Sequence, residues 1–256
     1  MLLAIDVGNS HTVCGIFKKN QIVNHWRFKT DRRKTSDDLA VSFYTMLSLK
    51  GMTFNDISGV IIASVVPTQQ KAWIGFIEEI GWSSLEVTKA LVANDIKILI
   101  DHPEEVGADR IVNAVAGFNR FATALIIVDF GTAITFDCVS AAGDYIGGAI
   151  APGVAISLDA LAAQTAKLPR VDLSKAPSSS IGKNTTDAIR SGILYGYGGM
   201  VDGLVKHLQE GFEDISPKVI ATGGMADLII PYTTTVETYD PMLTLVGLQI
   251  LYERNS

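Results

Sequence analysis

Two short turns in this sequence combine an aspartate and a glycine with hydroxyl or amide side chains. The first is Asp6-Val7-Gly8-Asn9-Ser10 and the second is Asp129-Phe130-Gly131-Thr132-Ala133. Glycine in a tight turn between strands permits backbone angles that a Cβ forbids, so the turn amides can face a phosphate beside further Asn, Ser or Thr donors. The neighbouring carboxylate can hold a hydrated cation. The pattern therefore predicts phosphate binding.

The spacing of the two turns indicates an internal duplication. Subtracting 6 from 129 gives 123, close to half of the 256 residues, and each turn lies between two strand-like apolar runs. A lone Asp-x-Gly is an ordinary hairpin turn. The geometry of a turn does not by itself require the same hydroxyl or amide side chains at both turns. The repeat therefore favours a pair of phosphate-binding hairpins facing one cleft.

A second candidate for chemistry is Gly107-Ala108-Asp109-Arg110. It directly precedes a helical pattern formed by Ile111, Val112, Val115 and Phe118. Two interpretations remain open for Asp109. It can cap the helix, because Asp is favoured in a first turn. It can also act as a general base, because a helix N-terminus favours the ionised carboxylate and the Gly-Ala lead-in lets a substrate approach.

Other motifs are weaker. Gly147-Gly148, Pro152-Gly153 and Thr222-Gly223-Gly224 are ordinary turn sequences, although small residues also let an adenine ring pass between backbone segments. His11 either touches phosphate or is simply solvated or hydrogen bonded. The sequence contains no GxxxxGK[ST] or GxGxxG fingerprint and no Ser-His-Asp arrangement.

Composition narrows the class of protein. A net charge of −6 and a pI near 5.2 argue against an extended nucleic-acid surface. Cys14 and Cys138 occupy matching strands and have no CxxC partner, so we expect neither a disulfide nor a zinc site. No signal peptide precedes Asp6, and the longest uncharged runs are too short for a bilayer, so we expect a soluble, cytoplasmic protein without a membrane partner.

The periodicity predicts an α/β fold of two domains, each opening with three antiparallel strands. In the first half we expect a third strand at 21–28, a helix capped by Ser36 or Asp37, a strand at 60–66 and a helix at 68–80. In the second half we expect strands at 124–129, 133–139, 144–150 and 218–221. Helices are expected at 154–165 and 185–209, with a closing helix from Pro241.

Taken together, these motifs resemble those of type III pantothenate kinase, a family of the actin-like superfamily of acetate and sugar kinases. The shared motifs, in order, are Asp6 to Ser10 with Gly15, Ser64-Val65-Val66-Pro67, Gly107 to Arg110, Asp129 to Ala133, Gly147-Gly148 with Pro152-Gly153, and Thr222-Gly223-Gly224. The resemblance covers nearly the whole chain. It implies two duplicated ribonuclease H-like domains around a nucleotide cleft, with ranges 1–118 and 119–256, the second carrying the adenosine side and the dimer interface.

The resemblance also implies an activity and a set of site residues. The activity is ATP-dependent phosphorylation of pantothenate to 4′-phosphopantothenate, the first step towards coenzyme A. The implied ATP-binding residues are Asp6, Val7, Gly8, Asn9, Ser10, His11, Thr12, Val13, Gly131, Thr132, Gly223 and Gly224. The implied pantothenate-binding residues are Gly107, Ala108, Asp109, Arg110 and Thr185, with Thr185 acting across a homodimer that shares its active sites.

Specific roles follow from the same resemblance. Asp109 is the implied catalytic base, Asp6 the implied holder of Mg²⁺ through water, and Asp129 the implied ligand of K⁺ or NH₄⁺. The chain departs from the family at Ile100, where a tyrosine is frequent, and at His11, where a small polar residue is usual.

Two alternatives stay open. The chain could be a regulatory relative without catalysis, although it keeps Asp6, Asp109 and Asp129, and its acidity disfavours DNA. It could also be a kinase for another small molecule, because fold alone does not determine the acceptor.

Overall fold

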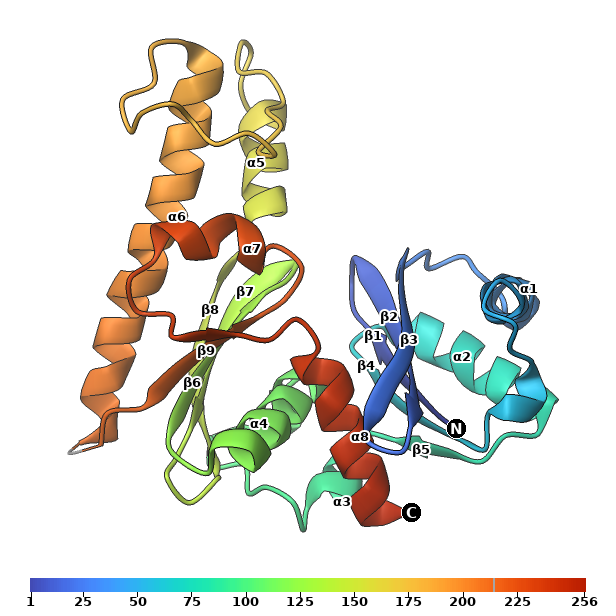
Figure 1. Cartoon of the computed structure of the whole chain (residues 1–256). Helices are drawn as coiled ribbons and strands as arrows, with labels where there is room; N and C mark the ends of the chain where they lie inside the picture. The colour runs from blue at the N-terminus through green and yellow to red at the C-terminus, as the bar shows by residue number, and fades with distance from the viewer. Residues whose placement is uncertain (214) are drawn as a thin grey trace. The chain divides into compact units, whose positions relative to one another are not determined.

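The computed structural model describes residues 1–213 and 215–256 (Figure 1). The chain divides into two compact units. The first contains residues 1–97, 101–116 and 242–256, and the second contains residues 98–100 and 117–241. Each unit is built around one five-stranded mixed sheet. The units are described separately below.

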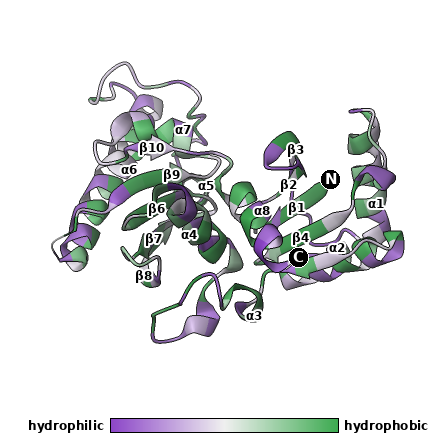
Figure 2. Ribbon diagram, turned by 60° about the horizontal axis from the view of Figure 1, so that its bottom comes forward, coloured by the Kyte–Doolittle hydropathy of each residue, from purple (hydrophilic) through white to green (hydrophobic). Residues whose placement is uncertain are grey.

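The sheet of the first unit runs in the order β3-β2-β1-β4-β5. Its strands are β1 (Leu2–Val7), β2 (His11–Lys18), β3 (Gln21–Lys29), β4 (Gly59–Ser64) and β5 (Ser84–Glu86). The first three form an antiparallel meander, while β4 and β5 are added parallel to β1. Strands β1 and β4 are almost wholly apolar (Figure 2), as expected for strands covered on both faces.

Helices cover both faces of this sheet. Alternate residues of β1, including Leu3 and Ile5, share a core with Phe43 of α1 (Ser36–Ser48) and Trp73 of α2 (Pro67–Ile80). On the opposite face, α8 (Leu243–Asn255) packs so closely that a Cβ on Gly15 would lie 2.8 Å from Leu245. The C-terminal helix thus belongs to the first unit, although the sequence-based range 119–256 groups it with the second half.

The cap of α1 differs from the expectation of Ser36 or Asp37. Thr35 is the N-cap: its side chain accepts the Asp38 N–H, and the Asp38 carboxylate accepts the Thr35 N–H at 3.0 Å. This reciprocal capping box satisfies two free amides at once, which a cap one residue later would not. The remaining helical segments of the unit are α3 (Lys89–Val92), α4 (Ala108–Phe121), whose last five residues lie in the second unit, and short 3₁₀ turns at Phe54–Asp56 and Pro103–Glu105.

The second unit repeats this plan. Its sheet has the order β10-β9-β6-β7-β8, formed by β6 (Leu125–Phe130), β7 (Ala133–Val139), β8 (Tyr145–Pro152), β9 (Lys218–Thr222) and β10 (Thr238–Tyr239). Again three antiparallel strands are followed by two strands parallel to the first. Asp6 and Asp129 are each the fifth of six residues in the corresponding strand. The predicted duplication is therefore confirmed.

Three helices accompany the second sheet: α5 (Val154–Ala163), α6 (Thr185–Gln209) and α7 (Ala226–Ile229), with 3₁₀ turns at Glu210–Phe212 and Ile230–Tyr232. Leu194 and Val201 of α6 join the core beneath β6 and β7. Helix α5, the start of α6 and their connection project beyond the sheet (Figure 1).

Cys14 and Cys138 are both buried, and neither forms a disulfide within the described residues. No helix in residues 1–213 or 215–256 is long and apolar enough to cross a membrane.

Candidate active site

The first phosphate turn joins β1 to β2. The Gly8 N–H donates a hydrogen bond to the His11 carbonyl at 3.0 Å, and a Cβ on Gly8 would lie 2.9 Å from that same oxygen. Gly8 is not among the residues with positive φ. Glycine is therefore required here by the close approach of two backbone segments, and not by the unusual backbone angles that the sequence analysis invoked.

The hydroxyl of Thr12 lies beneath this turn. Thr12 is only 3% exposed, and its Oγ1 is 3.0 Å from Thr30 Oγ1, which donates to the Gly8 carbonyl at 2.8 Å. The Thr30 N–H also donates to the Ser10 carbonyl. Of the hydroxyl and amide residues in this segment, Asn9 and Ser10 are exposed, whereas Thr12 supports the turn from within.

Gly107 to Arg110 lie on the same side of the first unit as this turn. Val65 follows β4, and its N–H donates to the Val7 carbonyl at 3.1 Å. The Val65 side chain would be 3.4 Å from a Cβ on Gly107. The end of β1, which carries Asp6, and the start of α4, which carries Asp109, are thus linked through a single residue.

The Asp109 carboxylate is partly buried at the N-terminus of α4. Its Oδ1 accepts the Arg110 N–H at 2.8 Å. Burial raises the pKa of the Asp109 carboxyl, and the Arg110 amide and guanidinium offset that rise in part. A helix N-terminus favours the ionised form, but at Asp109 the loss of hydration is the larger effect. A raised pKa makes the ionised carboxylate a stronger base.

The second phosphate turn joins β6 to β7 and is packed by two glycine turns. The Gly131 N–H donates to the Ala133 carbonyl at 3.1 Å. A Cβ on Gly153 would lie 2.2 Å from the Thr132 carbonyl oxygen, and a Cβ on Gly223 would lie 2.4 Å from Asp129 Oδ1. Gly223 also has a φ of +94°. These glycines let the ends of β8 and β9 pack closely against the second turn, because a side chain at either position would overlap it.

A buried polar network in this unit escaped the sequence analysis. Asp137 is fully buried and accepts hydrogen bonds from the Thr135 and Tyr145 hydroxyls, each at 3.0 Å. Thr135 pairs directly with Asp129 across the sheet. The only signal in the sequence is one acidic residue within an apolar strand, Ile134 to Val139. The Thr135 hydroxyl is thus bonded to Asp137 on the strand that pairs with β6.

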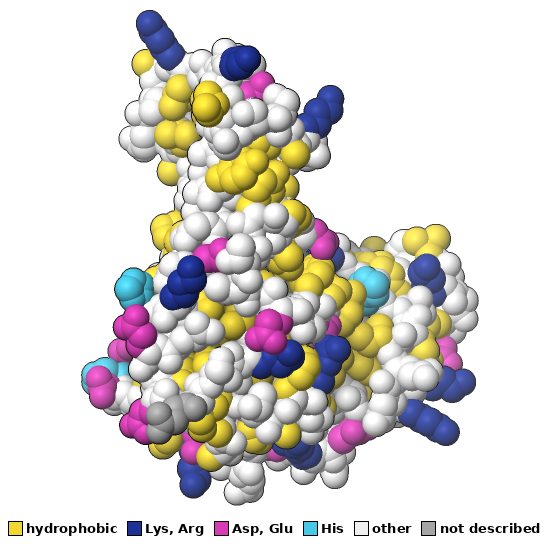
Figure 3. Space-filling view, turned by 60° about the vertical axis from the view of Figure 1, so that its left-hand side comes forward, with side chains coloured by type: hydrophobic (Ala, Val, Ile, Leu, Met, Phe, Trp, Pro, Cys, Tyr) yellow, Lys and Arg dark blue, Asp and Glu magenta, His cyan; other side chains and the backbone are white. Residues whose placement is uncertain are grey.

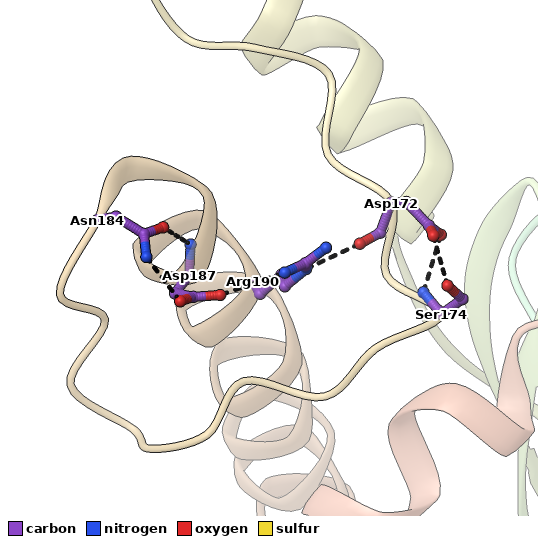
Figure 4. Close-up of polar contacts among 5 residues, drawn as sticks. All are labelled: Asp172, Ser174, Asn184, Asp187 and Arg190. Atoms are coloured by element: carbon purple, nitrogen blue, oxygen red, sulfur yellow. Dashed lines mark hydrogen bonds and ion pairs between the residues drawn. The ribbon is translucent and has the colours of Figure 1, made fainter.

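Thr185 lies apart from these turns, at the exposed first position of α6. The Asn184 side chain caps the helix by accepting the Asp187 N–H at 2.9 Å. Arg190 then joins the Asp187 carboxylate to the Asp172 carbonyl and ties down the connection from α5 (Figure 4). Thr185, Leu161 and Ile193 are among the residues that line a pocket of about 630 Å³.

Comparison with known proteins identifies the family. The family profile described as type III pantothenate kinase matches residues 2–207. The type III pantothenate kinase of Citrifermentans bemidjiense is 50% identical over all of both chains. The enzyme of Desulfotalea psychrophila is 49% identical over 98% of this chain and 97% of its own. The chain belongs to the type III pantothenate kinase family. It is therefore a pantothenate kinase, an ATP-binding enzyme of coenzyme A biosynthesis.

A solved structure supports the fold. Component A of (R)-2-hydroxyglutaryl-CoA dehydratase from Acidaminococcus fermentans superimposes with a TM-score of 0.58 at 18% identity, covering 98% of this chain and 96% of that one. At this identity the likeness concerns the fold alone. It agrees with the duplicated domains of the actin-like ATPases.

Proposed function

We propose that Asp109 is the general base that activates the primary hydroxyl of pantothenate for attack on the γ-phosphorus of ATP. The hydroxyl oxygen forms the new P–O bond, the bond to the β–γ bridging oxygen breaks, ADP leaves, and Asp109 takes the proton. The observation that carries this assignment is the partly buried carboxylate of raised pKa at the start of α4, linked through Val65 to the end of β1. Arg110 and Gly107 bind pantothenate beside it.

Phosphoryl transfer depends mainly on positioning and on neutralising charge. The exposed Asn9 and Ser10 of the first turn, together with Gly131 and Thr132 of the second, bind phosphate oxygens. Asp6 holds hydrated Mg²⁺, since a partly buried carboxylate beside turn amides suits an oxygen-ligated cation, and Mg²⁺ when bound neutralises phosphate charge. Gly223 and Gly224 accommodate the nucleotide near Asp129.

Asp129 is the proposed ligand of K⁺ or NH₄⁺. The Asp129 carboxylate is partly buried near the end of β6, where the second turn begins, and it supplies an anionic oxygen for a cation beside the ATP phosphates. Within residues 1–213 and 215–256, no three His, Cys, Asp or Glu side chains are grouped to hold a metal ion. The remaining ligands therefore come from backbone carbonyls, water or ATP.

The enzyme is proposed to be a homodimer. Gly192, Gly196, Gly199 and Gly203 lie along one side of α6, and a Cβ on any of them would meet nothing within 4 Å. Exposed hydrophobic side chains gather on the projecting part of the unit (Figure 3), where α5 carries the exposed Ile156 and the connection to α6 carries the exposed Ile181. A second copy of the chain would bury both features and bring its Thr185 to the partner's pantothenate.

The proposal is tested by measuring ADP release from Mg-ATP with pantothenate, sugars, acetate or water as the acceptor, with and without K⁺. We expect turnover with pantothenate only, accompanied by formation of 4′-phosphopantothenate. Turnover with a sugar but not with pantothenate would mean that the fold serves another acceptor. No turnover with any acceptor, despite bound Mg-ATP, would favour a regulatory protein.

A further inference from the structure

Basic side chains line the outer strand of the first sheet, next to the first phosphate turn. Strand β3 is one of the two edge strands, and its odd-numbered residues, including Arg27 and Lys29, are exposed. Arg27 pairs with Val13, and Lys29 pairs with His11 at the end of the turn. Partners in antiparallel strands direct their side chains to the same face of the sheet.

This register places the cations on the same face as Asp6. Val13 pairs with Arg27 on one side and with Asp6 on the other, so the three residues form a row across β1, β2 and β3. Two strand spacings separate the ends of the row by roughly 10 Å. Val13, in the middle, is short and apolar. The long Arg27 side chain can therefore lean over Val13 towards a phosphate held near Asp6.

The positive charges of Arg27 and Lys29 act electrostatically on the first phosphate turn. In the described part of the chain, neither side chain forms an ion pair with a carboxylate. Besides burial, these two cations lower the pKa of His11. A third cation stands at the tip, where Arg32 Nη2 donates to Asn9 Oδ1 at 3.1 Å. Three basic side chains, Arg27, Lys29 and Arg32, thus border the first turn, and none of them forms an ion pair within the described residues.

We propose that Arg27 and Lys29 bind the phosphates of ATP and supply the fixed positive charge of the first phosphate site. This inference rests on the proposed function. Asp6 and Asp109 add negative charge to the same unit, so a polyanion there needs neutralisation beyond that of a bound Mg²⁺. Arg offers a fork that matches phosphate oxygens, and Lys offers a compact charge. The simpler explanation is that exposed charges merely protect an edge strand from pairing with another molecule.

The test compares Arg27→Gln, Lys29→Gln and the double variant with Lys18→Gln. Lys18 is an exposed cation at the far end of β2, paired with Gln21, so the control removes the same charge away from the turn. Titration calorimetry with Mg-ATP, without pantothenate, gives the nucleotide Kd. Each loss should weaken binding about tenfold, the size of a charge-assisted hydrogen bond, and the double variant should be weaker still. Lys18→Gln should bind as the wild type does.

Three outcomes would overturn the inference. Unchanged ATP affinity in the double variant would mean that Arg27 and Lys29 only protect the edge strand from pairing with another molecule. A raised KM for pantothenate with an unchanged Kd for ATP would assign the cations to the acceptor's carboxylate. Equal weakening by Lys18→Gln would indicate a general charge effect.

Circular dichroism checks folding, and Arg27→Lys should restore part of the affinity. Because the titration needs no acceptor, a wild type that binds Mg-ATP but fails to phosphorylate pantothenate would refute the proposed function alone.

Discussion

At the scale of single residues, Asp109 experiences two opposing influences. Burial favours its protonated form, while the Arg110 amide and guanidinium favour the ionised form, and the net effect is a raised pKa. This balance lets the carboxylate take a proton readily while a helix terminus still orients it.

Replacement of Asp109 by Asn should reduce kcat by about 10²–10⁴-fold, because the amide cannot accept the proton. Mg-ATP affinity should be unchanged in the same titration. An Asp109→Asn enzyme with nearly full turnover would show that Asp109 only caps α4.

The wild-type pH profile should reflect the same group. The base must be ionised, so kcat/KM for pantothenate should fall as the pH drops through the raised pKa, at a pH above the ordinary Asp value of about 3.9. Stability has the opposite dependence, because a raised folded-state pKa favours the protonated native state. That contribution is complete below the ordinary pKa and is lost as the pH rises through the raised one. Asp109→Asn should therefore leave the thermal midpoint at neutral pH unchanged or higher.

Asp129→Ala tests the proposed monovalent cation site. Removing the carboxylate takes away the anionic ligand beside the second turn, so activity should be low and no longer respond to K⁺. Initial rates in K⁺, NH₄⁺ and a large organic cation measure this. If wild-type rates are equal in all three, Asp129 has another role.

At the scale of elements, the position of each glycine on α6 decides its effect. A Cβ on Gly198 would lie 2.1 Å from the Tyr232 carbonyl, whereas Gly196 and Gly199 face open space in their own subunit. Neighbouring positions on one helix thus distinguish a side packed within the chain from the side that we propose meets a second copy.

Gly196→Leu and Gly199→Leu should weaken the dimer and lower activity while leaving the fold intact, because a bulky side chain prevents close approach of a second helix. Gly198→Ala should instead destabilise the subunit, by about 1–3 kcal/mol for overpacking. Sedimentation velocity and thermal unfolding separate the two effects. For a monomer, Gly196→Ala would only raise stability, by about 0.5–1 kcal/mol, since alanine suits a helix better than glycine.

At the scale of the whole molecule, the proposed sharing of active sites between subunits predicts that two weakly active variants restore activity when mixed. We mix Asp109→Asn with Thr185→Arg, each weakly active by itself. A heterodimer carries both lesions in one site and neither in the other. Random pairing makes half of the dimers mixed, so about a quarter of wild-type activity should return. Proven subunit exchange without recovery would contradict the shared site and leave Thr185 as an ordinary helix residue.

Local patterns in the sequence determined most of the secondary structure and the identity of the site motifs. Helix α6 has the bounds 185–209 that the sequence predicts, since the Asn184 cap is encoded within one turn of the chain. The meanders around Asp6 and Asp129 follow from alternating apolar residues and a turn. Strands β5 and β10 and helices α3 and α7 were not predicted, because segments of two to four residues carry too little periodicity.

The tertiary structure decided which distant residues meet. Packing brings Gly223 to Asp129, Val65 to Gly107 and α8 to the first sheet, although each pair is far apart in the chain. It also turns the Thr12 hydroxyl inward to Thr30 and aligns Arg27 with Asp6. Local propensity cannot specify such contacts, because they depend on strand register and on the burial of apolar faces from the whole unit. The sequence therefore identified the chemical groups, and only the fold determined which of them lie side by side.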